Sequence, residues 1–560
     1  MRLPFTAPAD APNARRDLLL LFALALVVLG AGFGLRDPWP SDEPRFALVA
    51  KLMVDTGNWI IPHRGQEMYA DKPPVLFWIQ GLFYALSGSL RLAFLLPSTL
   101  SGLLVLALVY DLSRRLYDHQ TGLLAAFVLL ICVQFGFQMR AAQIDPLLLG
   151  WMTLSLYGLL RHLLLGPAWG WYWLGWFFAG IGAITKGVGP LTLLILIPYA
   201  LARWFRPAAL AQAPRALDWR WWVGPLFMIA ASLIWLGPML YAVTLSQDPE
   251  KVAYANEILF KQTAKRYVDP WGHLEPWWYL PASALFNWLP LTLALPFAWP
   301  ALKRCWQRTD LRVLLPLAWV ILIMLFFSAS PGKRDVYVLP GLPMLVLALA
   351  PLLPEITKKA AFQRVCFVVA LLISGLLLVI AGFGEFGDVR ALKRIVESRE
   401  LDPWPLVGCI GAMGLLATLC ARARRGLLGF AGMMISVWVL YGFWGYPLLN
   451  DARSGRSVME RAGKMIGPQA ELALVGWREQ HLLQADRAVT EFGFLEPGNV
   501  QEKAAHAWLQ QAPDKRWVFL QQPNLARCFV PERARFVGHA NRREWFLVDQ
   551  SALKDQCDAP

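Results

Sequence analysis

Residues 41–74 read SDEPRFALVAKLMVDTGNWIIPHRGQEMYADKPP, and they follow an apolar run at 18–35. Two adjacent carboxylates, Asp42 and Glu43, therefore stand where a membrane helix emerges into water. Charged groups at the edge of a bilayer are costly to keep there, and they are usually functional. We therefore treat this stretch as the part of the chain around which the rest is organised.

The first half of the stretch predicts a helix. Asp42 is placed to cap it, and Pro44 is tolerated because the N–H groups of a first helical turn have no intrahelical partners. Three apolar residues recur at helical spacing, namely Phe46, Val49 and Met53. We expect this helix to lie on the membrane surface.

Composition identifies the class of protein. Of the 560 residues, 57% are hydrophobic and only 16% are charged, which excludes an ordinary soluble enzyme and indicates an integral membrane protein. The net charge of +14 comes from Lys and Arg residues in short links between apolar runs, as the positive-inside rule expects. This distribution argues against a nucleic-acid partner.

Thirteen apolar runs are long enough to cross about 30 Å of hydrocarbon. They lie at 18–35, 92–112, 121–139, 145–164, 171–185, 187–203, 221–245, 279–300, 311–329, 335–352, 363–382, 404–421 and 427–446. A fourteenth candidate, 75–89, has only 15 residues and follows Pro73 and Pro74. If it does not span, the basic clusters near 15, 114, 161, 203–220, 303–312, 358–364 and 422–425 all fall on one side of the membrane, so we expect an interfacial helix there. The outer loops near 251–266 and 333–334 are basic as well, which makes them candidates for contacting anions.

This topology divides the chain into a transmembrane catalytic domain (1–446), whose first outer loop is 37–91, and an outer domain (447–560). The outer domain is richer in charge. Short apolar runs at 472–477, 517–521, 536–538 and 545–548 predict strands, and 456–466 and 501–511 predict helices. We expect a small α/β domain. Cys528 and Cys557 lie in it, and a disulfide between them would need an oxidising compartment, but the sequence leaves the pairing open.

The same topology collects carboxylates and cations on the outer face. They are Asp42, Glu43, Arg45, Tyr69, Asp71, Lys72, Asp145, Lys186, Lys265, Arg266, Lys333, Arg334 and Tyr337. Such a set suits a reaction on a phosphate-linked lipid, because cations hold phosphate while a carboxylate orients or deprotonates the acceptor.

Simpler explanations stay open for several of these residues. Asp145 is equally suited to capping a helix, and Lys186 to snorkelling from a short turn, although the glycines that flank that turn favour a ligand site. Tyr69 and Tyr337 also fit an interfacial aromatic belt. A metal site is an alternative use of outer His and acidic residues, but no paired-ligand spacing supports it. Its candidates are Asp71, His63, His273 and Glu275.

A set of motifs in order across residues 39–340 resembles the GT-C glycosyltransferases, which use polyprenyl-phosphate-linked sugars and include the protein O-mannosyltransferases. The motifs are WPSDEPRFALVAKLMVDTGNWIIPH, YADKPP, QIDP, ITKG, a loop ending at Lys265–Arg266–Tyr267, WWYL and SPGKRDVYVLP. Within that superfamily the chain is most similar to bacterial transferases that attach aminoarabinose to lipid A. It departs from the pattern we expect at Phe46, where we expect Tyr, and at Asp71, where we expect Glu.

The resemblance implies a GT-C fold with its active site at the outer, periplasmic face of the bacterial inner membrane. It implies that Asp42 is the leading catalytic residue and that Glu43, Lys72 and Asp145 share its cavity. It places the donor phosphate near the remaining set, which is Arg45, Tyr69, Lys186, Lys265, Arg266, Lys333, Arg334 and Tyr337. The implied donor is undecaprenyl-phosphate-linked 4-amino-4-deoxy-L-arabinose, and the implied acceptor is a phosphate of lipid A, a modification that gives resistance to cationic peptides such as polymyxin.

The implied reaction makes modest demands on the protein. A lipid A phosphate is already a nucleophile at neutral pH, and cationic side chains suffice to stabilise a leaving phosphate, so we assume no metal. Two other functions remain alternatives. One is transfer of the same kind of lipid-linked sugar to protein or to another glycan. The other is lipid transport, against which the spans contain few ionisable residues and no matched halves with broken helices.

Overall fold

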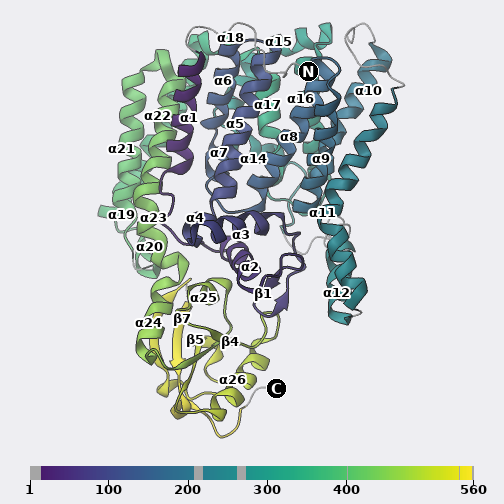
Figure 1. Cartoon of the computed structure of the whole chain (residues 1–560). Helices are drawn as coiled ribbons and strands as arrows, with labels where there is room; N and C mark the ends of the chain where they lie inside the picture. Colours follow the sequence, from purple (N-terminus) through teal and green to yellow (C-terminus); the bar gives the residue numbers. More distant parts are fainter. Residues whose placement is uncertain are drawn as a thin grey trace.

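The protein is described by a computed structural model that covers residues 14–206, 218–246, 248–260, 273–399, 401–541 and 543–557. Lys265 and Arg266 lie outside these ranges. A bundle of long helices forms most of the molecule, and a smaller domain with a sheet lies at one end of it (Figure 1). We call that end the C-terminal domain side.

The helices of the bundle come from residues 14–440. They are α1 (Ala14–Gly30), α5 (Leu96–Leu116), α6 (His119–Leu130), α7 (Val133–Gln138), α8 (Ile144–Leu164), α9 (Trp169–Lys186), η1 (Gly189–Ile195), α10 (Leu196–Phe205), α11 (Val223–Ser246), α14 (Tyr279–Asn287), α15 (Leu295–Arg308), α16 (Leu311–Ala329), α17 (Gly341–Leu349), α18 (Leu353–Lys358), α19 (Ala360–Phe386), α21 (Trp404–Ala421) and α22 (Gly426–Leu440). Each of the thirteen expected spans overlaps one or more of these helices.

Length and composition allow seven helices of the described chain to cross a membrane. A pair bent by 95°, Tyr279–Asn287 with Leu291–Arg308, adds an eighth. Several expected spans are broken into shorter helices, such as α6 followed by α7 and η1 followed by α10. The chain is a multi-pass membrane protein, and the count of thirteen crossings stays a prediction.

Glycines let neighbouring helices of the bundle approach closely. A Cβ added at Gly158 of α8 would lie 2.4 Å from the carbonyl oxygen of Trp171 on α9. A Cβ at Gly189 would lie 2.4 Å from the carbonyl oxygen of Ala179 on α9. Lipid provides no hydrophobic driving force for association between membrane helices, so these helices associate through close packing. Small residues at the crossings allow that close packing. These contacts hold α9 against α8 and η1.

The first outer loop forms a layer between the bundle and the smaller domain (Figure 1). It contains α2 (Glu43–Thr56), the hairpin of β1 (His63–Arg64) and β2 (Glu67–Met68), α3 (Val75–Ser87) and α4 (Leu90–Ala93). Helix α3 runs across the end of the bundle instead of along it, as expected for an interfacial helix. Two further short helices outside the membrane core are α12 (Pro249–Asn256) and α20 (Arg390–Arg399).

We expected helix α2 to lie on the membrane surface, and this prediction is wrong because protein packs against both of its sides. Phe46, Val49 and Met53 are buried in a hydrophobic cluster that also contains residues of α3, α8, α9 and α11. The opposite side of α2 contributes Leu48 and Leu52 to a cluster of the C-terminal domain. The helical periodicity was therefore right, but protein covers the apolar residues of this helix.

The C-terminal domain follows α23 (Tyr446–Ser454) and is a five-stranded sheet with helices on both faces. Its elements are α24 (Arg456–Ile466), β3 (Glu471–Val475), α25 (Glu479–Gln484), β4 (Val489–Glu491), α26 (Gly498–Gln511), β5 (Arg516–Gln521), β6 (Arg535–Ala540) and β7 (Arg543–Val548). The strand order is β4-β3-β5-β7-β6, with β4 and β5 parallel to β3 and with β7 antiparallel to β5 and β6. The expected helices and four strands are confirmed.

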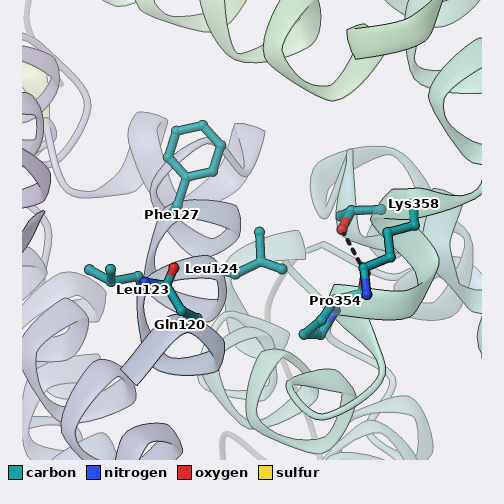
Figure 2. A pocket seen from close by; sticks show the side chains of 7 residues that line it. Gln120, Leu123, Leu124, Phe127, Pro354 and Lys358 are labelled. Carbon is teal, nitrogen blue, oxygen red and sulfur yellow. Dashed lines mark hydrogen bonds between the residues drawn. The ribbon is translucent and has the colours of Figure 1, made fainter. Parts of the chain in front are cut away.

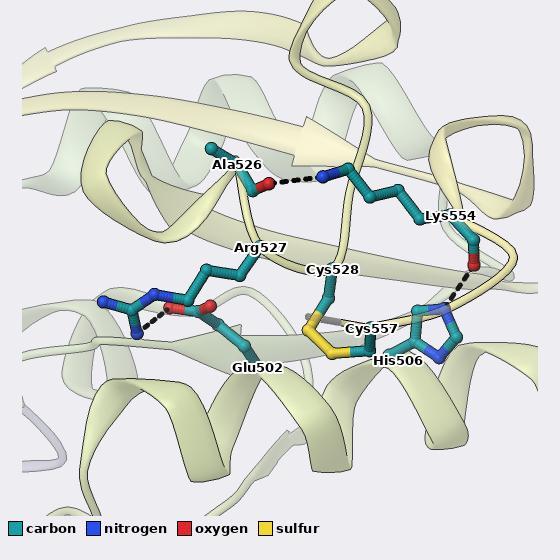
Figure 3. The surroundings of a disulfide bond; sticks show 7 residues. All are labelled: Glu502, His506, Ala526, Arg527, Cys528, Lys554 and Cys557. Carbon is teal, nitrogen blue, oxygen red and sulfur yellow. Dashed lines mark hydrogen bonds and ion pairs between the residues drawn. A yellow bond between two sulfur atoms is a disulfide. The ribbon is translucent and has the colours of Figure 1, made fainter. Parts of the chain in front are cut away.

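Side chains of the sheet alternate between the two faces, as the geometry of a strand requires. Leu472 and Leu474 pack with α24, whereas Ala473 and Val475 pack with α26. Behind α26, Cys528 and Cys557 form a disulfide, which answers the pairing that the sequence left open (Figure 3).

Candidate functional site

Glu43 is the structural anchor of the first outer loop. Its buried carboxylate accepts hydrogen bonds from two guanidinium nitrogens of Arg36 and from the backbone N–H groups of Trp39, at 2.8 Å, and Ala142, at 2.9 Å. Removing one member of such a buried pair leaves an uncompensated charge. Glu43 thereby fixes the start of α2 against Ala142. Ala142 lies two residues before α8 and three residues before Asp145.

Asp37 joins the same loop to the C-terminal domain. It is buried, and its carboxylate accepts hydrogen bonds from Arg91 of the loop, from Arg456 of α24 and from Asn450 of α23. Burial alone would raise the pKa of this carboxyl, but these hydrogen bonds outweigh it and hold the pKa well below its usual range. Asp37 therefore stays ionised and keeps three segments together.

Asp42, the neighbour of Glu43, is much less constrained. It occupies the position before α2, but its backbone is helical (φ −102°, ψ −34°) and its side chain makes no capping hydrogen bond, so the capping role is wrong. The carboxylate instead lies 3.7 Å from a guanidinium nitrogen of Arg334 and keeps 21% of its side chain exposed. Of the two adjacent acids, Asp42 is the one that an incoming substrate can reach.

Asp145 and Lys186 form the second charged pair. Asp145 lies in the first turn of α8, where Gln143 holds the N-cap position, so the capping alternative is also wrong. The Lys186 ammonium, in the last turn of α9, donates to the Asp145 carboxylate at 2.5 Å. Each charge complements the dipole at its own helix end. Gly187 (φ +82°) ends α9 in the left-handed conformation that glycine favours, which sets the direction of the chain beyond Lys186.

The segment 330–338 connects the two pairs. Arg334 precedes η6 (Asp335–Val338), and Tyr337 lies within it. The Tyr337 ring lies 5.0 Å from the Lys186 ammonium, a cation–π distance, while Arg334 contacts Asp42. The structure thus brings Asp42, Arg334, Tyr337, Lys186 and Asp145 into one sequence of contacts, which we call the charged chain.

Lys333 is directed away from the charged chain. Its ammonium is buried and donates to the carbonyl oxygens of Glu275, at 2.7 Å, and Pro331, at 3.5 Å. Its backbone N–H donates to the carbonyl of His273, so the segments around 273–275 and 331–333 lie side by side. Lys333 holds a loop in place, and its ammonium has only neutral carbonyl partners among the contacts just described.

Other candidates from the first outer loop lie at the boundary with the C-terminal domain. Arg45 pairs with Glu479 of α25 at 2.8 Å, and Tyr69 is buried beside Arg45. Burial raises the pKa of Tyr69, and the negative charge of Asp71 adds to that rise. Asp71 and Lys72 lie two and three residues after Tyr69 and are both partly buried.

The metal candidates do not gather. In the described ranges no three His, Cys, Asp or Glu side chains lie close enough to hold a metal ion. His63 has its Nδ1 2.9 Å from the Ile61 carbonyl oxygen, and His273 and Glu275 offer their backbone carbonyls to Lys333.

A shallow groove lies away from the charged chain, between α6 and α18 (Figure 2). It measures about 450 Å³, and it is lined by Gln120, Leu123, Leu124, Phe127, Pro354, Thr357 and Lys358. Helix α18 lies at the end of the bundle opposite the C-terminal domain (Figure 1). The groove contains one cation and no acid among its lining residues, and it brings no candidate of the outer face into contact.

Known proteins resemble this chain in both sequence and fold. The family model described as dolichyl-phosphate-mannose-protein mannosyltransferase matches residues 71–235. An undecaprenyl phosphate-alpha-4-amino-4-deoxy-L-arabinose arabinosyl transferase of Pseudomonas aeruginosa is 30% identical over 84% of this chain and 81% of its own length. The chain belongs to this arabinosyl transferase family. It is a glycosyltransferase, and a relative from an Enterobacter species is 28% identical over 77% of this chain and 78% of its own.

A solved protein structure has the same fold as this chain. The crystal structure of ArnT from Cupriavidus metallidurans bound to undecaprenyl phosphate matches with a TM-score of 0.74 and 18% identity, over 98% of this chain and 100% of that one. This likeness confirms the expected GT-C membrane fold with a small C-terminal α/β domain.

Residues that the sequence analysis missed hold the site together. Arg36 and Asp37 immediately follow the first apolar run, so their position at the membrane edge was a usable signal. Glu479 gave no such signal, because its partners Arg45 and Arg64 are more than 400 residues away in the chain. The structure does not describe Lys265 or Arg266, and their role stays a prediction.

Proposed function

We propose that the protein transfers 4-amino-4-deoxy-L-arabinose from undecaprenyl phosphate to a phosphate of lipid A. The observation that carries the proposal is the charged chain, because it places an accessible carboxylate, Asp42, beside cations that suit phosphate. Support for the sugar and for the donor lipid comes from the names of the relatives in the arabinosyl transferase family.

The orientation follows from charge. Basic residues gather at the end of the bundle opposite the C-terminal domain. Examples are Arg114 and Arg115 in the last turn of α5, and Lys358 in α18. The positive-inside rule assigns that end to the cytoplasm. The charged chain and the C-terminal domain then face the periplasm from the inner membrane, where an oxidising environment permits the disulfide of Cys528 with Cys557.

In the proposed reaction an oxygen of the acceptor phosphate attacks the anomeric carbon of the sugar. The bond between that carbon and the donor phosphate oxygen breaks, and undecaprenyl phosphate leaves with the bonding electrons. No proton has to be removed from a phosphate that is already ionised, so a base contributes little. The leaving group gains negative charge, which Arg334 and Lys186 would stabilise in the transition state.

Asp42 then acts as an orienting group. Its carboxylate can pair with the ammonium group of the aminosugar and hold the anomeric carbon in line with the acceptor oxygen. Lys186 is paired with Asp145, so a donor phosphate would share or replace that partner. Glu43 supports the reaction only through the backbone that it anchors.

A direct test uses the purified full-length protein in detergent with synthetic undecaprenyl-phosphate-aminoarabinose and lipid A. Mass spectrometry should show lipid A that has gained one aminopentose, dependent on both protein and donor. Unmodified lipid A together with sugar on an added secreted protein would replace this proposal with a protein glycosyltransferase. Transfer without a sealed membrane would argue against lipid transport as the primary activity.

A further inference from the structure

The C-terminal domain contacts the first outer loop through one edge of its sheet. This is the edge at which the parallel strands β3, β4 and β5 have their carboxyl ends. Glu491, the last residue of β4, accepts a hydrogen bond from the backbone N–H of Gln66 at 2.9 Å. In return, Glu67 of β2 accepts one from the backbone N–H of Leu495 at 3.1 Å. Open α/β sheets commonly bind ligands at this edge. Here the hairpin of the loop occupies part of it.

Glu479 is the charged centre of this contact. It is the first residue of α25, just beyond β3, and it is only 4% exposed. Its carboxylate accepts a hydrogen bond from Nε of Arg45 at 2.8 Å and lies 3.8 Å from Nη1 of Arg64. The Arg64 guanidinium lies 3.7 Å from the centre of the Phe494 ring and 5.5 Å from that of Tyr69. One carboxylate of the C-terminal domain therefore balances two cations of the loop.

Both cations lead directly to candidate site residues. Arg45 lies three residues after Asp42, about one helical turn along the start of α2. Arg64 and Arg45 flank Tyr69, which lies two residues before Asp71 and three before Lys72. The partners of Glu479 described above, Arg45 and Arg64, are not members of the charged chain. Glu479 can influence the site only by placing these two segments of the loop.

We propose that Glu479 is a positioning residue for glycosyl transfer, acting through Arg45 on Asp42 and through Arg64 on the segment 69–72. The inference rests on the proposed function. Without the negative charge, two guanidinium groups that share one carboxylate repel each other, and the buried Arg64 loses a counter-charge. The start of α2 then shifts relative to η6. A misplacement of about 1 Å at a reacting group costs on the order of 100-fold in rate.

The experiment compares the full-length wild type with Glu479→Gln, which keeps the shape and removes the charge. We expect kcat to fall about 10- to 100-fold while KM for the donor changes less than about threefold, because positioning acts in the transition state. Glu479→Asp should recover most of kcat. The matched control is Glu471→Gln, which removes the Glu471–Arg516 pair (2.9 Å) at the far end of β3 and should leave kcat unchanged.

A second readout needs no substrate. Amide hydrogen exchange should accelerate in the first turn of α2 and at 64–69 in Glu479→Gln, but not in β5 or α26. Arg45→Gln should produce the same exchange pattern, and the double variant should be no worse than either single one.

Several results would overturn the positioning role. They are a wild-type kcat in Glu479→Gln, an equal loss in Glu471→Gln, and exchange that rises throughout the C-terminal domain. If the wild type fails to modify lipid A, the proposed function falls, and the exchange pattern still decides the role of Glu479. If Glu479→Gln does not fold, Arg45→Gln, which breaks the same pair from the loop side, supplies the comparison with the wild type.

Discussion

Charges serve different purposes at the two ends of the helical bundle. On the C-terminal domain side, buried acids join segments that are far apart in the chain, as Asp37 does with Arg456 and Glu479 with Arg45. At the opposite end Asp111 also joins α5 to α8 through Tyr157, but Asp310 pairs with Arg312 and Glu355 pairs with Lys358 within their own helix ends, and the second pair is largely exposed. Local exposed pairs contribute little to stability. The buried acids Asp37 and Glu479 thus hold together the segments around the charged chain, whereas the pairs of Asp310 and Glu355 concern only their own helix ends.

The largest effect should come from the accessible acid. Asp42→Asn should reduce kcat by about 10³-fold, because the orienting charge near Arg334 is lost while the side-chain shape is kept. The control is Asp310→Asn at the opposite end, which should transfer sugar at the wild-type rate. Lipid A mass spectrometry over time measures both. Comparable rates in the two variants would remove Asp42 from the mechanism.

The next effect concerns folding. Glu43→Gln should lower the free energy of unfolding by about 3 kcal/mol, since Arg36 would remain buried without its counter-charge. Glu355→Gln, which loses only an exposed pair with Lys358, should change it by less than about 1 kcal/mol. Denaturant titration in detergent compares the two. Equal losses would mean that the difference between the two ends does not exist.

A smaller change in activity is expected at the second pair of the charged chain. Lys186→Met should lower kcat/KM for the donor about 10- to 100-fold, because a cation that would hold phosphate is removed. Lys186→Arg keeps the charge and should lose less. Lys358→Met in the groove of Figure 2 supplies the control. The assignment of the donor phosphate fails if Lys186→Met and Lys358→Met behave alike.

The smallest effect is a pH dependence in the C-terminal domain. Glu502 is buried on α26 with Arg527 at 3.6 Å, and burial raises the pKa of this carboxyl to about 7 (Figure 3). A raised pKa means that the folded domain binds the proton more tightly than the unfolded chain does. The resulting stability is fully present below the ordinary pKa of 4.5 and is lost as the pH rises through about 7.

Glu502→Gln has no proton to lose, so it should remove this part of the pH dependence. At pH 8 the variant should be more stable than the wild type by on the order of 1–3 kcal/mol, and near pH 4.5 the two should converge. Thermal unfolding of the full-length protein at several pH values measures it. A pH profile that is the same in wild type and variant would show that Glu502 does not titrate in this range.

Much of the fold could be predicted from the sequence, because membrane helices and short strands have local signals. The long apolar runs located the helices of the bundle, and the short apolar runs of the C-terminal domain located β3, β5, β6 and β7. β4, with three residues, and α25, with six, were missed because neither is long enough to show a period. The covering of α2 on both sides was also missed, since an apolar stripe does not say whether lipid or protein will face it.

Part of the membership of the site was predictable from the sequence, but its pairing was not. Topology placed Asp42, Lys186 and Arg334 on one face, as the structure does. It could not distinguish Asp42 from Glu43, which differ only in what folds against them. The partners of Glu43 include a backbone N–H 99 residues away, and no local pattern encodes such a contact.

Helix α2 contributes Phe46 to the cluster under the bundle and Leu48 to the core of the C-terminal domain. Evolution therefore cannot exchange the C-terminal domain as an independent module. A chimaera that receives residues 455–557 from a relative would fit its new host only if residues 43–69 came with them. The C-terminal domain and the loop therefore have to change together in evolution, although nearly 400 residues separate the two along the chain.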